Sequence, residues 1–396
     1  FENSILKITI SNLQIEYEGT LGKDNVIVGV FKQGGQSFPM NLSKEAIEKE
    51  KLVRPQEPVK PYPYYSEDIT FENKKAGILL AGTLALPKKE GVFPVVTLIS
   101  GSGPQNRDEE LLGHKPFLVI SDYLTKNGIA VLRFDDRGTA LSKGDFKTAT
   151  SADFATDVEA GIDYLKTRKE INKKQIGLIG HSEGGIIAPM VASKSKDVAF
   201  IILLAGTGIK GDELLLLQQK LIGKVAGVSD EDLQKNESLN RKAFDIINKS
   251  NNLEELKINL TGYLKQSLKS NLNSEKSERM SDDDFIKLQV NQLVNPWMLY
   301  FIKYNPAPIL EKVKCPVLAL NGEKDLQVPP KENLEAIKKA LIKGGNKKVT
   351  VKELPNLNHL FQECKTGSPG EYGTIEQTFS PTALKEILGW IRTQTK

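Results

Sequence analysis

The chain has 396 residues, a formal net charge of +4, 39% hydrophobic residues and 26% charged residues. These values are typical of an ordinary globular protein with room for a large α/β core and additions. The basic residues are dispersed and no apolar run approaches the roughly 18 residues of a membrane span, so we expect no nucleic-acid partner and no membrane span. Two cysteines exclude a disulfide framework and a four-cysteine metal site.

The first 47 residues alternate between apolar and polar side chains, which predicts a small antiparallel β unit. We expect strands at 5–10, 13–17 and 26–31, and turns at 22–25 and 34–35. So small a unit buries little apolar surface by itself and must pack against another part of the protein. Because the chain begins at Phe1 rather than at Met, we expect a fragment or a processed product. A signal peptide could have been removed, and the compartment stays undetermined.

A proline-rich segment, 48–66, predicts an extended linker that acts as a stiff spacer. One domain is expected from residue 67 to residue 396, opening with a hairpin at 68–72 and 78–86. Apolar strands then alternate with helices, which predicts a mostly parallel sheet with helices on both faces. The expected strands are 94–99, 130–134, 175–179, 198–204, 316–320 and 349–354, and the expected helices are 117–126, 152–167, one after Pro330 and one from Pro381.

The interval from about 208 to 308 breaks this alternation, because it is polar and helical in pattern. It lies between two strands of the sheet, so it is expected above their carboxyl ends, where open α/β sheets bind ligands. We predict a helical cap there; the alternative is a solvated helical decoration. Trp297 and Phe301 are the residues of this interval expected to face a substrate, although they could also form the core of the cap.

The stretch from Gly180 to Gly184 reads Gly-His-Ser-Glu-Gly and matches G-x-S-x-G. An apolar strand pattern precedes it and a small-residue helix pattern follows it, which is the context of a nucleophile elbow. In such a turn the strained backbone exposes the serine hydroxyl, here that of Ser182. The alternative is a chance match in a glycine-rich chain.

A nucleophilic serine needs a base, and the chain has three histidines. His181 is next to Ser182, and neighbouring side chains in this turn diverge. His114 precedes a helix, where a structural role is adequate. His359 directly follows the last strand, in a loop from which a base can reach the serine. We therefore predict His359 as the base.

The acid that orients the base is expected after the preceding strand, where Glu323 and Asp325 lie. Asp325 is favoured and Glu323 is the competitor. The order Ser182, Asp325, His359 is the order of α/β hydrolases. For the oxyanion hole, the pattern favours the backbone N–H groups of Glu183 and of Ser102, which lies in the glycine-rich loop 100–108. The charged run 133–138 predicts buried ion pairs beneath the site.

Seven stretches together resemble the α/β-hydrolase superfamily, and within it bacterial carboxylesterases of the dienelactone-hydrolase-like and serine-aminopeptidase-like groups. They are 33–39, 54–58, 100–105, 135–138, 180–185, 322–325 and 358–362. The resemblance implies a capped hydrolase of short acyl esters, often exported, with a small β domain in front. Within 100–105, Gln105 joins Trp297 and Phe301 as a substrate-binding candidate.

The chain departs from this pattern in two places. Ala140 stands where many relatives have a second glycine after Arg137 and Gly138, and the front domain looks truncated. Ser182 also argues against the activity of dienelactone hydrolases proper, which use a cysteine nucleophile.

The sequence therefore predicts a serine hydrolase that cleaves small carboxylic esters through an acyl-enzyme. We expect no metal ion and no organic cofactor. The alternatives are a serine peptidase acting on short peptides, an acyl transferase, or a non-catalytic binding protein with a hydrolase fold. The physiological ester and the oligomeric state are not predicted.

Overall fold

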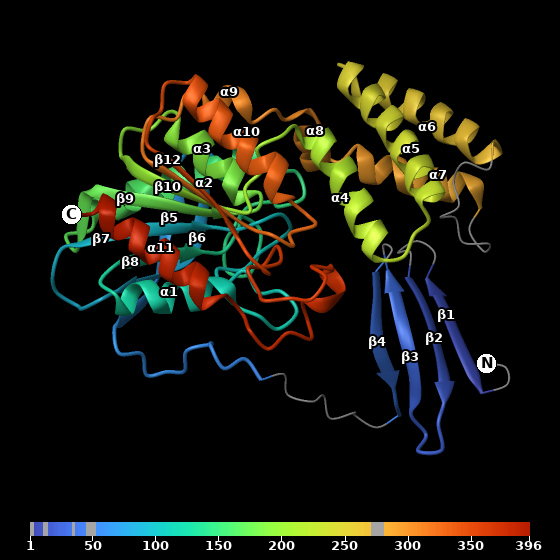
Figure 1. The fold of residues 1–396 in the computed structure, drawn as a ribbon, viewed down its shortest axis with the longest axis horizontal. Coiled ribbons are helices and arrows are strands. Elements are labelled where there is room, and N and C mark those ends of the chain that lie inside the picture. Colours follow the sequence, from blue (N-terminus) through green and yellow to red (C-terminus); the bar gives the residue numbers. More distant parts are fainter. Residues whose placement is uncertain (1–3, 11–14, 34–35, 45–52, 271–280) are drawn as a thin grey trace. The chain divides into compact units, whose positions relative to one another are not determined.

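The computed structural model of the protein describes residues 4–10, 15–33, 36–44, 53–270 and 281–396. These form two compact units (Figure 1). One comprises Phe1–Val53 with Gln234–Asn295, and the other comprises Arg54–Leu233 with Pro296–Lys396. The expected turn at 34–35 and the first residues of the expected linker, 48–52, lie outside the described residues.

An eight-stranded sheet forms the centre of the second unit, in the order β12-β11-β10-β9-β7-β8-β6-β5. The six strands from β12 to β8 run parallel, and β6 runs antiparallel to both of its neighbours. The strands are β5 (Tyr65–Asn73), β6 (Ile78–Leu86), β7 (Phe93–Ile99), β8 (Ala130–Phe134), β9 (Ile171–His181), β10 (Val198–Leu204), β11 (Val317–Gly322) and β12 (Val349–Leu354).

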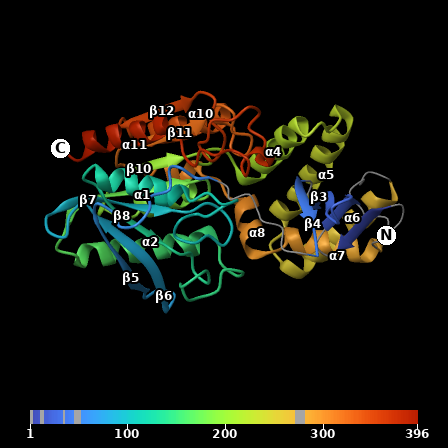
Figure 2. The same cartoon turned by 90° about the horizontal axis from the view of Figure 1, so that it is seen from below.

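Helices cover both faces of this sheet, as the alternation of strands and helices predicted (Figure 2). On one face lie α2 (Ser151–Thr167), α3 (Gly184–Ala192) and α10 (Pro330–Lys343). On the other face lie α1 (Pro116–Lys126) and α11 (Pro381–Gln394). The α/β architecture and the mostly parallel sheet are therefore confirmed.

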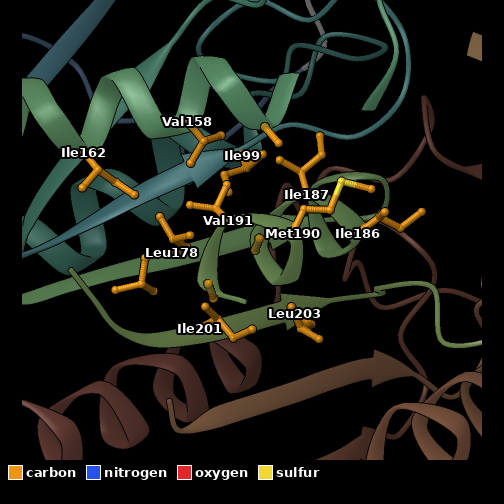
Figure 3. Packing of buried hydrophobic residues seen from close by; sticks show 14 of the residues in the cluster. Ile99, Val158, Ile162, Leu178, Ile186, Ile187, Met190, Val191, Ile201 and Leu203 are labelled. Carbon is orange, nitrogen blue, oxygen red and sulfur yellow. The ribbon is translucent and has the colours of Figure 1, made fainter. Parts of the chain in front are cut away.

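The core consists of two apolar clusters, one on each face of the sheet. Strand β10 shows why, since consecutive residues of a fully covered strand alternate between the faces and all must be apolar: Ile201 belongs to one cluster and Ile202 to the other. Each such side chain contributes roughly 1.5–3 kcal/mol when buried. Figure 3 shows part of the first cluster, with Ile99, Val158, Ile162, Leu178, Ile186, Ile187, Met190, Val191, Ile201 and Leu203 packed together.

The segment that begins at Arg54 is bound to the unit of the large sheet. The Arg54 guanidinium donates to the carbonyl oxygens of Ile375 at 2.6 Å and Gly373 at 2.9 Å. The Gln56 amide accepts from Phe379 N at 2.9 Å and donates to Phe379 O at 2.7 Å. The expectation of a stiff spacer is therefore wrong for residues 54–57, which are part of the second unit.

Within 208–308, the described residues form helices and no strand. Helices α6 and α7 begin at polar caps, because the side chain of Asn252 accepts from the N–H groups of Glu254 and Glu255, and that of Ser281 accepts from Asp284. The interval is divided between the two units, with α4, α8 and α9 in the unit of the large sheet. The helices are α4 (Gly211–Val225), α5 (Asp230–Lys249), α6 (Leu253–Lys269), α7 (Asp282–Leu293), α8 (Pro296–Lys303) and α9 (Ala307–Leu310).

A separate antiparallel sheet of four strands lies near the start of the chain, in the order β1-β2-β3-β4. Its strands are β1 (Ile5–Ile10), β2 (Ile15–Leu21), β3 (Ile27–Gln33) and β4 (Gln36–Leu42). The expected β unit is confirmed, and β4 is an additional strand. Gly29 opposes Gly19, and the buried Tyr17 ring lies over Gly29; a Cβ at Gly29 would lie 2.4 Å from the Tyr17 hydroxyl. None of the helices in the described ranges is long and apolar enough to cross a membrane.

Candidate active site

Ser182 lies in a tight turn between the end of β9 and the start of α3. Its backbone has φ +52°, in the left-handed region that costs energy for a residue with a side chain. Glycine is required on both sides of it. A Cβ at Gly180 would lie 2.0 Å from Gly184 O, and a Cβ at Gly184 would lie 2.2 Å from Ile99 O. The sequence G-x-S-x-G therefore permits a turn that larger residues would block.

His359 and Asp325 form a buried pair. His359 Nδ1 lies 2.8 Å from Asp325 Oδ2, and the two residues are 4% and 2% exposed. The other carboxylate oxygen, Asp325 Oδ1, accepts from Gln327 N at 2.9 Å and Val328 N at 2.8 Å. These donors fix the carboxylate, which in turn holds Nδ1 of the imidazole and leaves Nε2 for another partner.

Glu323, the competing acid, lies elsewhere. Its exposed side chain accepts from Asn356 N at 2.8 Å, at the turn after β12. Of the two acids, the structure brings Asp325 to His359. Ser182 and His359 share no direct side-chain hydrogen bond within the described part of the chain, a contact that often forms only when substrate binds.

The glycine-rich loop after β7 passes directly beside Ser182. A Cβ at Gly101 would lie 3.2 Å from Ser182 Cβ. The N–H of Gly101 donates to Glu109 Oε1 at 2.6 Å, so it is already used. Ser102 follows it and is exposed, and Gln105 Nε2 lies 3.4 Å from Ser102 O. The loop therefore brings Gly101 beside the serine, with Ser102 next in the chain and Gln105 against Ser102.

The side chain of Glu183, the residue after Ser182, points into the protein. It is 4% exposed, and Oε1 accepts from Ser151 Oγ at 2.7 Å and from Trp297 Nε1 at 2.8 Å. Burial raises the pKa of the Glu183 carboxyl, while the hydrogen bonds from Ser151 and Trp297 act in the opposite direction. Trp297 thereby joins helix α8 to the turn that carries Ser182.

Phe301 lies one turn after Trp297, with the two rings stacked at 5.1 Å between centroids. It is only 6% exposed and belongs to the apolar cluster of the sheet. Its side chain therefore packs in the core, and the expectation that Phe301 faces a substrate stays a prediction. The periodicity of a short aromatic helix does not separate the two roles.

The charged run 133–138 forms ion pairs that fix the loops beneath the site. Arg137 Nε contacts Asp157 Oδ2 at 2.7 Å, and Arg107 Nη2 contacts Asp135 Oδ2 at 2.7 Å. Asp136, in the same run, is buried, and burial raises its pKa to about 8, although hydrogen bonds from Ser100 and Gln105 act in the opposite direction.

A second pair of titratable residues lies against the site and was not predicted as part of it. His181 Nδ1 lies 2.9 Å from Glu109 Oε1, and His181 Nε2 lies 3.0 Å from the carbonyl oxygen of His359. Burial lowers the pKa of His181, but the Glu109 charge and these hydrogen bonds outweigh it and raise the pKa overall. No periodicity in the sequence marks Glu109, which stands in a short acidic loop.

The third histidine is structural. His114 Nδ1 lies 3.0 Å from Thr378 Oγ1, and His114 Nε2 lies 2.9 Å from Tyr372 O. Across the described residues, no group of three or more His, Cys, Asp and Glu side chains is arranged to hold a metal ion.

Comparison with known proteins gives a family and a fold. The family described as "Serine aminopeptidase, S33" matches residues 117–363. Esterase EstD from Thermotoga maritima is 26% identical over 337 residues, which cover 83% of this chain and 69% of that protein. The solved structure of the α/β hydrolase GrgF from Penicillium sp. sh18 has a TM-score of 0.50 at 16% identity, covering 83% of this chain and 99% of that one. This last similarity concerns the fold alone.

Proposed function

The chain belongs to the serine aminopeptidase S33 family of α/β hydrolases, and on this basis we propose that it is a carboxylesterase with a Ser182–His359–Asp325 triad. The observation that carries the proposal is the buried contact of 2.8 Å between His359 Nδ1 and Asp325 Oδ2. Asp325 follows strand β11 and His359 follows strand β12, and this is the chain order of the acid and the base in an α/β hydrolase.

In the first half-reaction, Ser182 Oγ attacks the ester carbonyl carbon while His359 Nε2 takes the hydroxyl proton. Asp325 holds the imidazole and stabilises the imidazolium that forms. The oxyanion accepts hydrogen bonds from the backbone N–H groups of Ser102 and Glu183. The bond to the alcohol oxygen then breaks, and His359 returns its proton to that oxygen, which leaves Ser182 acylated.

In the second half-reaction, water attacks the acyl carbon while His359 takes one of its protons. The bond to Ser182 Oγ breaks, the carboxylic acid leaves, and the proton returns from His359 to Ser182. Neither step draws on a group beyond the residues named and water.

We assign substrate contacts to Gln105 and Trp297, and a capping role to the helical interval from about 208 to 308. Gln105 lies in the loop beside Ser182, and Trp297 binds the side chain of Glu183. A substrate contact is tested by Trp297→Ala, which is expected to raise KM for acyl esters more than it lowers kcat.

The ester substrate is favoured over a peptide by the similarity to an esterase over most of this chain. The family description favours the second candidate, an aminopeptidase on short peptides that would use the same three residues. Matched aminoacyl p-nitrophenyl ester and p-nitroanilide substrates separate the two. We expect the ester to be cleaved by the wild type and not by Ser182→Ala, and turnover of the anilide at a comparable kcat/KM would favour the peptidase.

A further inference from the structure

A continuous line of hydrogen bonds joins the loop beside Ser182 to the backbone of the base. Glu109 Oε1 accepts from Gly101 N at 2.6 Å and lies 2.9 Å from His181 Nδ1. The other ring nitrogen, His181 Nε2, lies 3.0 Å from His359 O. The line passes through His181, which immediately precedes the nucleophile. It therefore connects the loop beside Ser182, the turn that carries Ser182 and the loop that carries His359.

The partners of His181 define its protonation. A carbonyl oxygen can only accept a hydrogen bond, so Nε2 must carry a proton. Glu109 Oε1 already accepts from Gly101 N, and as a carboxylate it takes a second hydrogen bond, which Nδ1 is placed to donate. A neutral imidazole has one N–H and satisfies one of the two acceptors. The geometry therefore favours an imidazolium that faces a carboxylate.

Among the described residues, few other charges surround this pair. The titratable groups that face His181 are Glu109, His359, whose ring centroid lies 4.9 Å away, and Asp325. The small cavity beside Glu109 and His181 is lined otherwise by apolar residues, namely Pro116, Phe117, Ile120, Leu204, Leu360 and Phe379. Glu109 is 5% exposed and His181 is 6% exposed, so water screens the pair little.

We propose that Glu109 and the His181 imidazolium are a positioning pair that sets the oxyanion loop and the base loop at once. The carboxylate fixes the Ser100–Gly101 peptide, one residue before Ser102, and the imidazolium fixes the carbonyl of His359. This inference rests on the proposed function, because it assigns a role to the pair through Ser102 and His359. Neither member of the pair needs to touch the substrate.

The pair gives the reaction an upper pH limit. A histidine whose pKa is raised in the folded protein keeps its proton below that pKa and loses it as the pH rises through it. Neutral His181 would then release either Glu109 or the carbonyl of His359. The alkaline limb of kcat therefore reports His181.

Glu109→Gln tests the pair with little change of shape. The amide oxygen can still accept from Gly101, but the charge that favours the imidazolium is gone. We expect kcat to fall about tenfold, as for a lost charged hydrogen bond, with KM nearly unchanged and the alkaline limb displaced to lower pH. Glu110→Gln, a change of an exposed neighbour in the same loop, is expected to keep the wild-type profile. An alkaline limb that stays at the wild-type pH in Glu109→Gln overturns the proposal.

A measurement on the wild type decides the matter even if the variant does not fold. The chain has three histidines, so their ring nitrogens can be followed by NMR in protein labelled with ¹⁵N-histidine, with His114→Gln to assign one of them. At pH 7 we expect His181 to carry protons on both ring nitrogens. A neutral His181 overturns the inference.

Labelling by a fluorophosphonate separates this inference from the proposed function. If Ser182 is labelled while His181 is neutral, the positioning pair fails and the triad stands. If Ser182 is not labelled, the proposed function fails, and the positioning role assigned to the pair fails with it, whatever the protonation state of His181.

Discussion

His359 and Asp325 lie 34 positions apart in the sequence, yet the Nδ1 atom of one is 2.8 Å from the Oδ2 atom of the other. Two neighbouring parallel strands, β11 and β12, bring them together, because the loop after each strand begins at the same edge of the sheet. The carboxylate also accepts two backbone N–H groups. It is therefore oriented by the chain before it orients the imidazole.

Asp325→Asn tests this relationship. An amide in place of the carboxylate favours the wrong tautomer of His359, and in another triad such a change costs about 10⁴ in kcat. We expect a loss of that order for p-nitrophenyl acetate, measured as steady-state kcat. Glu323→Gln is the matched control and should keep most of the activity. If Glu323→Gln is the crippling change, the acid is misassigned.

The glycines of the turn make a second test. At Gly184 a methyl group would lie 2.2 Å from a backbone oxygen of β7, which cannot move without disturbing the sheet. Gly184→Ala is expected to lose activity and several kcal/mol of unfolding free energy, or to prevent folding. Gly389, in the middle of α11, has no atom within 4 Å of its Cβ position. Gly389→Ala should raise stability by roughly 0.5–1 kcal/mol, and equal thermal midpoints for the two variants would contradict this account.

The buried Asp136 carboxyl is expected to make the stability of the protein depend on pH. Burial raises its pKa from 3.8 to about 8 in the folded protein. A raised carboxyl pKa means that its stabilising effect is complete below about 3.8 and is lost as the pH rises towards 8. Urea unfolding at pH 5, 6.5 and 8 should show the free energy of unfolding falling by an amount on the order of a few kcal/mol. The fall should be smaller in Asp136→Asn.

The exposed Asp163→Asn is the control for that series and should follow the wild-type curve. A wild-type decline that persists unchanged in Asp136→Asn would assign the pH dependence to another group.

The segment 54–57 contributes to the stability of the hydrolase unit. Arg54 donates to four backbone carbonyl oxygens, those of Leu112, Gly113, Gly373 and Ile375. Arg54→Ala should therefore lower the unfolding free energy by about 1–3 kcal/mol, measured by urea denaturation. Lys88→Ala, a change of an exposed residue, should have no such effect. An unchanged midpoint for Arg54→Ala would mean that the segment adds nothing.

Periodicity and turn residues make the sheet and the serine turn predictable from the sequence. Alternating apolar strands and amphipathic helices predict the parallel sheet, and the glycines around Ser182 predict a turn that the structure has, with its left-handed serine. The pairing of Asp325 with His359 is deduced from chain order, because loops at one edge of a sheet converge.

Contacts between distant polar groups could not be predicted in this way. Arg54 binds carbonyl oxygens, which every residue has, so no pattern of side chains marks its partners. Glu109 and His181 are 72 positions apart. Phe301 carries an aromatic ring that suits a substrate pocket and a core equally, so the sequence does not reveal that its side chain is buried in the apolar cluster of the sheet.

The central claim is that Ser182 is the nucleophile, and covalent labelling tests it most directly. The wild type is incubated with a fluorophosphonate, and the modified peptide is located by mass spectrometry. We predict a single adduct on Ser182, loss of ester hydrolysis in proportion to labelling, and no adduct in Ser182→Ala. The control is Ser193→Ala, a change of the serine at the C-terminal end of α3, which should be labelled like the wild type. An unlabelled Ser182, or a Ser182→Ala variant that keeps most of the esterase activity, would contradict it.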